Sequence, residues 1–137
     1  MIQIIAGEKG SGKTKKLINF VNDTAVSGKG IDVVLATTDR YRQEIKPEVR
    51  FIDVTEEGVN NFDRLIGFIK GLLCGNYDIE YVFIDGVHKM LATEIGSSIM
   101  ADFFMALDSI GEKSMVKFVL TVSCAVEKLP EFVKKYL

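Results

Sequence analysis

Residues 7–14, with the sequence GEKGSGKT, combine glycines, a lysine and a hydroxyl side chain at a spacing that suits phosphate binding. They fit the pattern G-x-x-x-x-G-K-[ST] without a mismatch. Glycines allow backbone N–H groups to approach an anion closely, because no Cβ atom stands in the way. Lys13 would place a cation against the β- and γ-phosphates of a nucleotide, and the Thr14 hydroxyl would ligate Mg²⁺.

The sequence on either side of this motif supports the same prediction. A short apolar run, residues 2–6, precedes it, and a helical pattern follows it. Free N–H groups at a helix N-terminus, together with the helix dipole, favour negative charge. The residues expected to contact the phosphates are Gly7, Glu8, Lys9, Gly10, Ser11, Gly12, Lys13 and Thr14.

An acidic residue ends another apolar run. This residue is Asp85, the last of the run YVFID, residues 81–85. In a parallel sheet ligands gather at the carboxyl ends of strands, where the phosphate loop also lies. Thr14 and Asp85 are therefore the predicted magnesium ligands, with Asp85 acting directly or through water. The alternative is a carboxylate that caps the following loop.

The residue after this aspartate cannot activate water. Hydrolysis needs a group that orients or deprotonates water near the γ-phosphate, and Gly86 has no side chain. His88, the only histidine, is the candidate catalytic residue, and a loop histidine without a catalytic task is an equal alternative. We expect Gly86→Glu to raise hydrolysis if the backbone there does not need a positive φ.

Other polar residues are expected near the same edge of the sheet. Thr121 and Ser123 could supply a hydroxyl that senses the γ-phosphate. Asp39, Arg40 and Arg42 are candidates for a substrate or transition-state contact, and an exposed polar loop is their alternative explanation.

The apolar runs that would position these residues are continuous rather than alternating, which is typical of strands covered on both faces. They span residues 2–6, 31–37, 81–85 and 116–123, and a shorter run at 50–54 predicts an edge strand. Amphipathic helical patterns lie between them. We predict one α/β domain over residues 1–137, a three-layer α/β/α open parallel sheet of four to five strands.

Composition excludes several classes of protein. The 137 residues carry a net charge of −2, which argues against nucleic-acid binding as the main role. Cys74 and Cys124 are isolated, so neither a zinc site nor a disulfide framework is expected. The first apolar run is too short for a signal peptide or a membrane span. We therefore expect a cytoplasmic protein without a membrane partner.

Across its length the sequence resembles the RecA-like core of P-loop NTPases, and most closely the nucleotide-binding domain of bacterial-type thymidine kinases. GEKGSGKTKKL is similar to that family's phosphate loop, including Ser11. TTDRYR resembles its Asp-x-Arg loop. IDGVH keeps Asp85 and His88 but has Gly86 where the family has a catalytic glutamate.

This resemblance implies the P-loop NTPase fold, with ATP or ADP and Mg²⁺ as cofactors. It places strand 116–123 between strands 2–6 and 81–85, and leaves an edge at residues 2–6 where a protein partner or a second copy could pair. The thymidine kinases also carry a zinc-bound lasso, for which this sequence has no cysteine pairs.

Three functions are compatible with these features. The first is an ATP-binding protein that hydrolyses Mg-ATP slowly, as a switch or an assembly component. The second is a small nucleoside or nucleotide kinase, against which the absence of a lid or acceptor insertion counts. The third is a non-catalytic interaction module that retains the phosphate loop. No Asn-Lys-x-Asp motif specifies guanine, which favours ATP over GTP.

Overall fold

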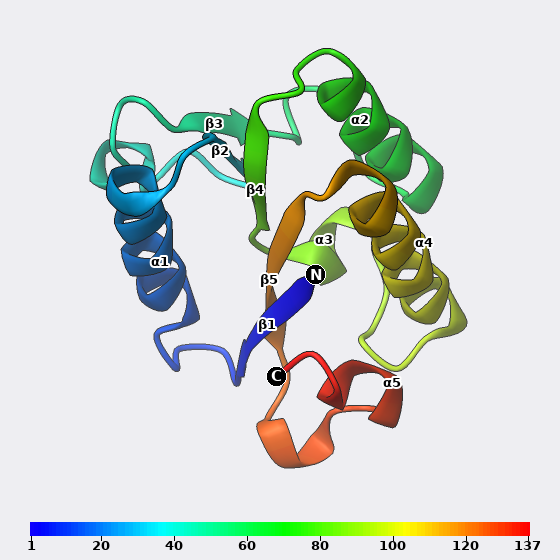
Figure 1. Ribbon diagram of the computed structural model, residues 1–137. Coiled ribbons are helices and arrows are strands. Elements are labelled where there is room, and N and C mark those ends of the chain that lie inside the picture. The colour runs from blue at the N-terminus through cyan, green and yellow to red at the C-terminus, as the bar shows by residue number, and fades with distance from the viewer.

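The computed structural model describes residues 1–137 and contains a single five-stranded sheet in the order β1-β5-β4-β2-β3 (Figure 1). All four neighbouring strand pairs are parallel. The strands are β1 (Ile2–Gly7), β2 (Ile31–Ala36), β3 (Arg50–Asp53), β4 (Ile79–Ile84) and β5 (Lys117–Ser123). The predicted parallel α/β sheet is confirmed, as are the position of β5 between β1 and β4 and the edge position of β3.

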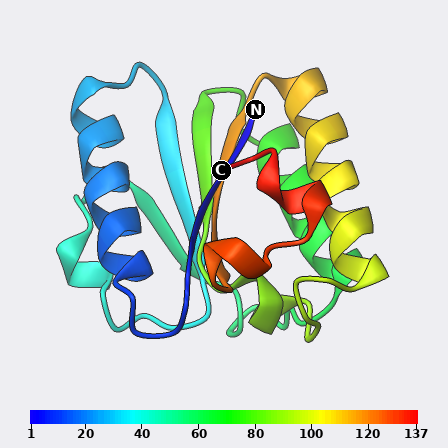
Figure 2. The same cartoon turned by 90° about the horizontal axis from the view of Figure 1, so that it is seen from below.

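Helices cover both faces of this sheet, unequally. Figure 2 shows α1 on one face and α2, α3, α4 and α5 on the opposite face. The helices are α1 (Lys13–Ser27), α2 (Phe62–Cys74), α3 (Val87–Met90), α4 (Ser98–Ser114) and α5 (Glu131–Lys134). None of them is both long and apolar enough to cross a membrane.

The helix starts differ in a way that matters for the cleft described below. Asn61 caps α2 and Ser97 caps α4, each accepting a hydrogen bond from a backbone N–H of the first turn. Before α1 stands Gly12, with φ 87° and no side-chain cap. The first N–H groups of α1 therefore remain free to bind a ligand.

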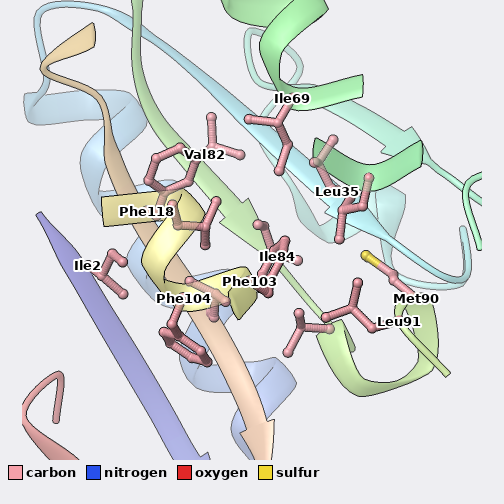
Figure 3. Packing of buried hydrophobic residues seen from close by; sticks show 14 of the residues in the cluster. Ile2, Leu35, Ile69, Val82, Ile84, Met90, Leu91, Phe103, Phe104 and Phe118 are labelled. Atoms are coloured by element: carbon pink, nitrogen blue, oxygen red, sulfur yellow. The ribbon is translucent and has the colours of Figure 1, made fainter. Parts of the chain in front are cut away.

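The central strands β2, β4 and β5 are buried on both faces, which explains their continuous apolar sequences. The larger core cluster, of 26 buried residues, lies between the sheet and helices α2, α3, α4 and α5. Figure 3 shows Phe103 and Phe104 of α4 beside Ile84 and Phe118 of the sheet. A smaller cluster of 10 buried residues, which includes Val119, lies under α1. Successive residues of β5 thus pack into different clusters, because their side chains point to opposite faces of the sheet.

The outer edge of β1 is partly covered by the last residues of the chain. The N–H of Ile4 donates to the carbonyl oxygen of Tyr136 at 2.9 Å. The ring of Tyr136 stacks on Phe104, with 5.4 Å between centroids. This corrects the expectation of a bare edge at residues 2–6, because a folded segment already takes one of its donors.

Candidate functional site

A polar cleft of about 840 Å³ opens at the carboxyl ends of the strands. Its walls come from the loop between β1 and α1, the segment after β2, the segment after β4 and the end of β5. Figure 2 shows the first three of these segments together along its lower edge. Only one of the 17 residues that line the cleft is hydrophobic. The predicted phosphate loop therefore meets the other predicted polar segments at one site.

Glycine has different reasons at different positions of the predicted phosphate loop. Gly10 and Gly12 have φ of 83° and 87°, in the left-handed region that residues with a Cβ rarely adopt. At Gly7 a Cβ would lie 2.3 Å from Ser11 Oγ, so the Ser11 side chain would have to move. The loop conformation thus depends most on glycine at positions 10 and 12.

The loop presents unpaired backbone donors. The N–H groups of Gly10, Gly12, Lys13, Thr14 and Lys15 donate no hydrogen bond within the protein. They surround the N-terminus of α1, whose dipole adds a partial positive charge. Such an arrangement of donors is a binding site for an anion.

Cations outnumber carboxylates around the cleft. The lining includes the basic residues Lys9, Lys13, Lys15, Arg40 and Lys89 and the acidic residues Glu44 and Asp85. The side chain of Lys13 folds back over the loop, where its Nζ donates to the carbonyl oxygen of Glu8 at 3.0 Å. The excess positive charge attracts a polyanion to the loop.

Asp85 lies at the centre of a set of hydroxyl groups. Thr121 Oγ1 donates to its Oδ1 at 2.6 Å, and the Tyr41 hydroxyl donates to its Oδ2 at 2.8 Å. Thr14 Oγ1 lies 3.4 Å from the same Oδ2. No backbone N–H donates to this carboxylate, so it does not cap the loop that follows it. Thr121, a candidate phosphate-sensing hydroxyl, lines the cleft and donates its hydrogen bond to Asp85.

The two predicted magnesium ligands therefore lie together. No group of three or more His, Cys, Asp and Glu side chains could hold a metal ion by itself. Thr14 and Asp85 nevertheless fit Mg²⁺, which typically keeps several waters and uses one or two protein oxygens together with phosphate oxygens. These residues suit Mg²⁺ that arrives with a nucleotide rather than a resident metal.

Two ionisable groups of the cleft have shifted pKa values. Burial raises the pKa of Tyr41 far above its ordinary value, and the neighbouring Asp85 carboxylate adds to the shift, so the phenol stays protonated as a donor. Burial lowers the pKa of His88, with Lys89 and Lys13 acting in the same direction and Asp85 opposing them. His88 Nδ1 is buried without a hydrogen-bond partner. His88 is therefore neutral at neutral pH, and it lines the cleft.

Gly86 adopts a conformation that overturns one expectation. Its φ is 88°, and its N–H donates to Thr121 Oγ1 at 3.1 Å. A Cβ there would lie 3.4 Å from Thr37 Oγ1. We expected Gly86→Glu to raise hydrolysis only if residue 86 did not need a positive φ. Because its φ is positive, a glutamate there would strain the backbone beside Asp85.

The segment after β2 reaches the cleft, but not through all the residues expected. Arg40 lines the cleft and Asp39 does not. The guanidinium of Arg42 lies over the ring of Phe51, 4.9 Å from its centroid, and donates to the Phe51 carbonyl oxygen. Arg42 thus stabilises the fold around β3 instead of contacting a substrate.

Sequence reasoning missed several residues of the lining: Thr37, Thr38, Tyr41 and Lys89. The signal for the first three was their place directly after β2, since the carboxyl end of every parallel strand meets this edge. That Tyr41 turns inward to Asp85 depends on the fold of its segment, which no local pattern predicts.

A smaller cavity of about 320 Å³ adjoins the cleft. His88 and Ser123 line both spaces. The remaining lining residues of the small cavity are Val87, Thr93, Glu94, Ile95 and Val122. His88 therefore separates the polar cleft from a partly apolar space of the size of a small organic molecule.

Comparisons with known proteins add no assignment. No model of a protein family matches the sequence, and no curated protein matches it significantly. Functional interpretation therefore depends on the residues and geometry of the cleft.

Proposed function

We propose that this protein is a RecA-like P-loop NTPase that binds Mg-ATP in the polar cleft and hydrolyses it slowly, as a switch or an assembly component. One observation carries the proposal. Thr14 Oγ1 and Asp85 Oδ2 lie 3.4 Å apart although 71 residues separate them in the sequence. The predicted phosphate loop, the Thr14 hydroxyl and the Asp85 carboxylate could therefore all bind the same Mg-nucleotide.

Each group has a task in nucleotide binding. The free N–H groups of Gly10 and of residues 12–15 would bind the phosphate oxygens. Lys13 would exchange the Glu8 carbonyl for the β- and γ-phosphates. Mg²⁺ would take Thr14 as a ligand and meet Asp85 directly or through water. The excess of basic residues in the lining supports a triphosphate as the ligand.

Slow hydrolysis follows from what surrounds the expected γ-phosphate position. Glu44 and Asp85 are the only acids that line the cleft, and Asp85 accepts hydrogen bonds on both oxygens. Gly86 supplies no side chain. Apart from the exposed Glu44, His88 is the remaining group of the lining that could orient water. Loss of a general base lowers a rate by about 10²- to 10⁴-fold, so turnover should fall well below a typical ~10 per second.

Thermal unfolding with nucleotide tests binding. Mg-ATP and Mg-ADP should raise the melting temperature, because a ligand of the folded state stabilises it by mass action. Lys13→Ala should weaken ATP more than ADP, since Lys13 is expected to reach the γ-phosphate. Lys16→Ala is the matched control, because Lys16 is exposed on α1 and does not line the cleft. An unchanged melting temperature at millimolar Mg-ATP would rule the proposal out.

The smaller cavity favours phosphoryl transfer to a small acceptor as a second candidate function. It adjoins the cleft at His88, where a neutral imidazole could accept the proton of an acceptor hydroxyl. A screen of nucleosides and nucleotides for acceptor-dependent release of ADP separates the two functions. ADP release that no acceptor accelerates favours the slow ATPase.

A further inference from the structure

The contact between Tyr41 and Asp85 joins the segment after β2 to the expected magnesium site. The Tyr41 hydroxyl donates to Asp85 Oδ2 at 2.8 Å, across 44 positions of sequence. Tyr41 is buried and is the hydrophobic residue of the otherwise polar lining. Neither the motif nor its spacing assigns it a task.

The tyrosine is held on several sides. Its ring packs edge-on against Phe51, with 5.2 Å between centroids. The 3-10 turn η1 (Arg42–Glu44) follows it directly. Asn22 of α1 fastens the end of this turn, donating to the Glu44 carbonyl oxygen at 2.8 Å and accepting from the Lys46 N–H at 3.0 Å. The hydroxyl is therefore a fixed donor.

Asp85 by contrast needs external support for its orientation. The terminal torsion of an aspartate is broad, so hydrogen bonds decide where the carboxylate points. Thr121 fixes Oδ1 and Tyr41 fixes Oδ2. A carboxylate oxygen has two acceptor sites. The Tyr41 hydroxyl occupies one acceptor site of Oδ2. The second acceptor site of Oδ2 remains directed at the Thr14 hydroxyl, 3.4 Å away.

We propose that Tyr41 is a positioning residue, whose hydroxyl orients the Asp85 carboxylate toward Mg²⁺ and so couples the segment after β2 to metal binding. This inference depends on the proposed binding of Mg-ATP. This role requires no contact of Tyr41 with the metal or the nucleotide. Its effect is confined to the magnesium-dependent part of nucleotide affinity.

Tyr41→Phe tests the inference, because it removes the hydroxyl and keeps the ring. ATP affinity is measured by calorimetry over a Mg²⁺ titration and again with EDTA. We expect the variant to need about 10-fold more Mg²⁺ for half of the magnesium-dependent gain in affinity, the size expected from one lost hydrogen bond to a charged group. Affinity in EDTA should equal that of the unmodified protein.

Tyr81→Phe is the matched control. Tyr81 lies on β4, stacks on Phe83 with 5.5 Å between centroids, and its hydroxyl makes no hydrogen bond. It should leave both affinities unchanged. A Tyr41→Phe variant with the Mg²⁺ dependence of this control, or with a tighter one, overturns the inference.

A double-mutant cycle separates positioning from a general effect on folding. If Tyr41 acts through the carboxylate, Tyr41→Phe should have no further effect on Mg²⁺ dependence once Asp85→Asn is present. An equal effect in both backgrounds contradicts the inference. Failure of the unmodified protein to bind Mg-ATP would instead contradict the proposed function, so the two failures are distinguishable.

Discussion

Gly86, the residue after Asp85, has a backbone conformation that only glycine tolerates well. Its φ of 88° and its hydrogen bond to Thr121 hold the turn between Asp85 and α3. Gly86→Ala should lower the free energy of unfolding by about 1–2 kcal/mol, the cost of the left-handed region for a residue with a Cβ. Urea denaturation measures this change.

Gly67→Ala is the control for this prediction. Gly67 lies inside α2, without a positive φ and with no atom within 4 Å of an added Cβ. Alanine there should stabilise the protein by about 0.5–1 kcal/mol. Equal effects of the two substitutions would show that the turn does not depend on glycine.

His88 should determine how hydrolysis depends on pH. Its lowered pKa keeps the imidazole neutral until the pH falls below the ordinary value of 6.5. Turnover should therefore be constant around neutral pH and fall only as the pH drops below 6.5, where the imidazole gains its proton. His88→Ala should lower turnover, remove this acid limb and leave ATP affinity nearly unchanged. Turnover that keeps its acid limb in the variant would show that another group titrates.

At the scale of elements, the covering of β1 accounts for an edge that would otherwise pair with another chain. The Tyr136 carbonyl takes the Ile4 N–H, and its ring is stacked on Phe104. Deletion of residues 135–137 should expose this edge and cause concentration-dependent association, measured by light scattering. Tyr136→Phe keeps the carbonyl and the stacked ring, so it should not associate. A truncated chain that scatters like the intact one would contradict this role.

The elements themselves were largely predictable from sequence. Continuous apolar runs identified four strands, because a parallel sheet buries both faces of its inner strands, and the shorter run at 50–54 identified the edge strand β3. The phosphate loop and Asp85 followed from a motif and from the end of a strand. The inward turn of Tyr41 and the positive φ of Gly86 could not be predicted, since both depend on contacts between segments distant in sequence.

For the whole molecule, a buried carboxylate should make stability depend on pH. Asp32 is 3% exposed, and its Oδ1 has no hydrogen-bond partner. Burial raises the pKa of Asp32, Glu80 adds to this, and a hydrogen bond from Thr24 opposes it. The folded state therefore holds this proton more tightly than the unfolded chain.

The direction of the pH effect follows from that difference. Below the ordinary pKa of 3.8 the carboxyl is neutral in both states and carries no penalty. As the pH rises through and above that value, the unfolded state gains from ionisation first, so the free energy of unfolding decreases until the folded pKa is passed. Asp32→Asn should reduce this decrease in urea denaturation between pH 4 and 8. Asp78→Asn, on an exposed residue, is the control, and an Asp32→Asn variant that follows the control at every pH would contradict the prediction.

Calorimetric titration of ATP into the unmodified protein tests the central claim most directly. With Mg²⁺ present we predict saturable binding of one ATP per chain, because the chain has one phosphate loop. EDTA and Lys13→Ala should each weaken it, since EDTA would remove the Mg²⁺ that we propose Thr14 and Asp85 bind, and the substitution removes a cation of the loop. Absence of binding at millimolar ATP, or binding that neither change affects, would contradict the assignment of the cleft as a Mg-ATP site.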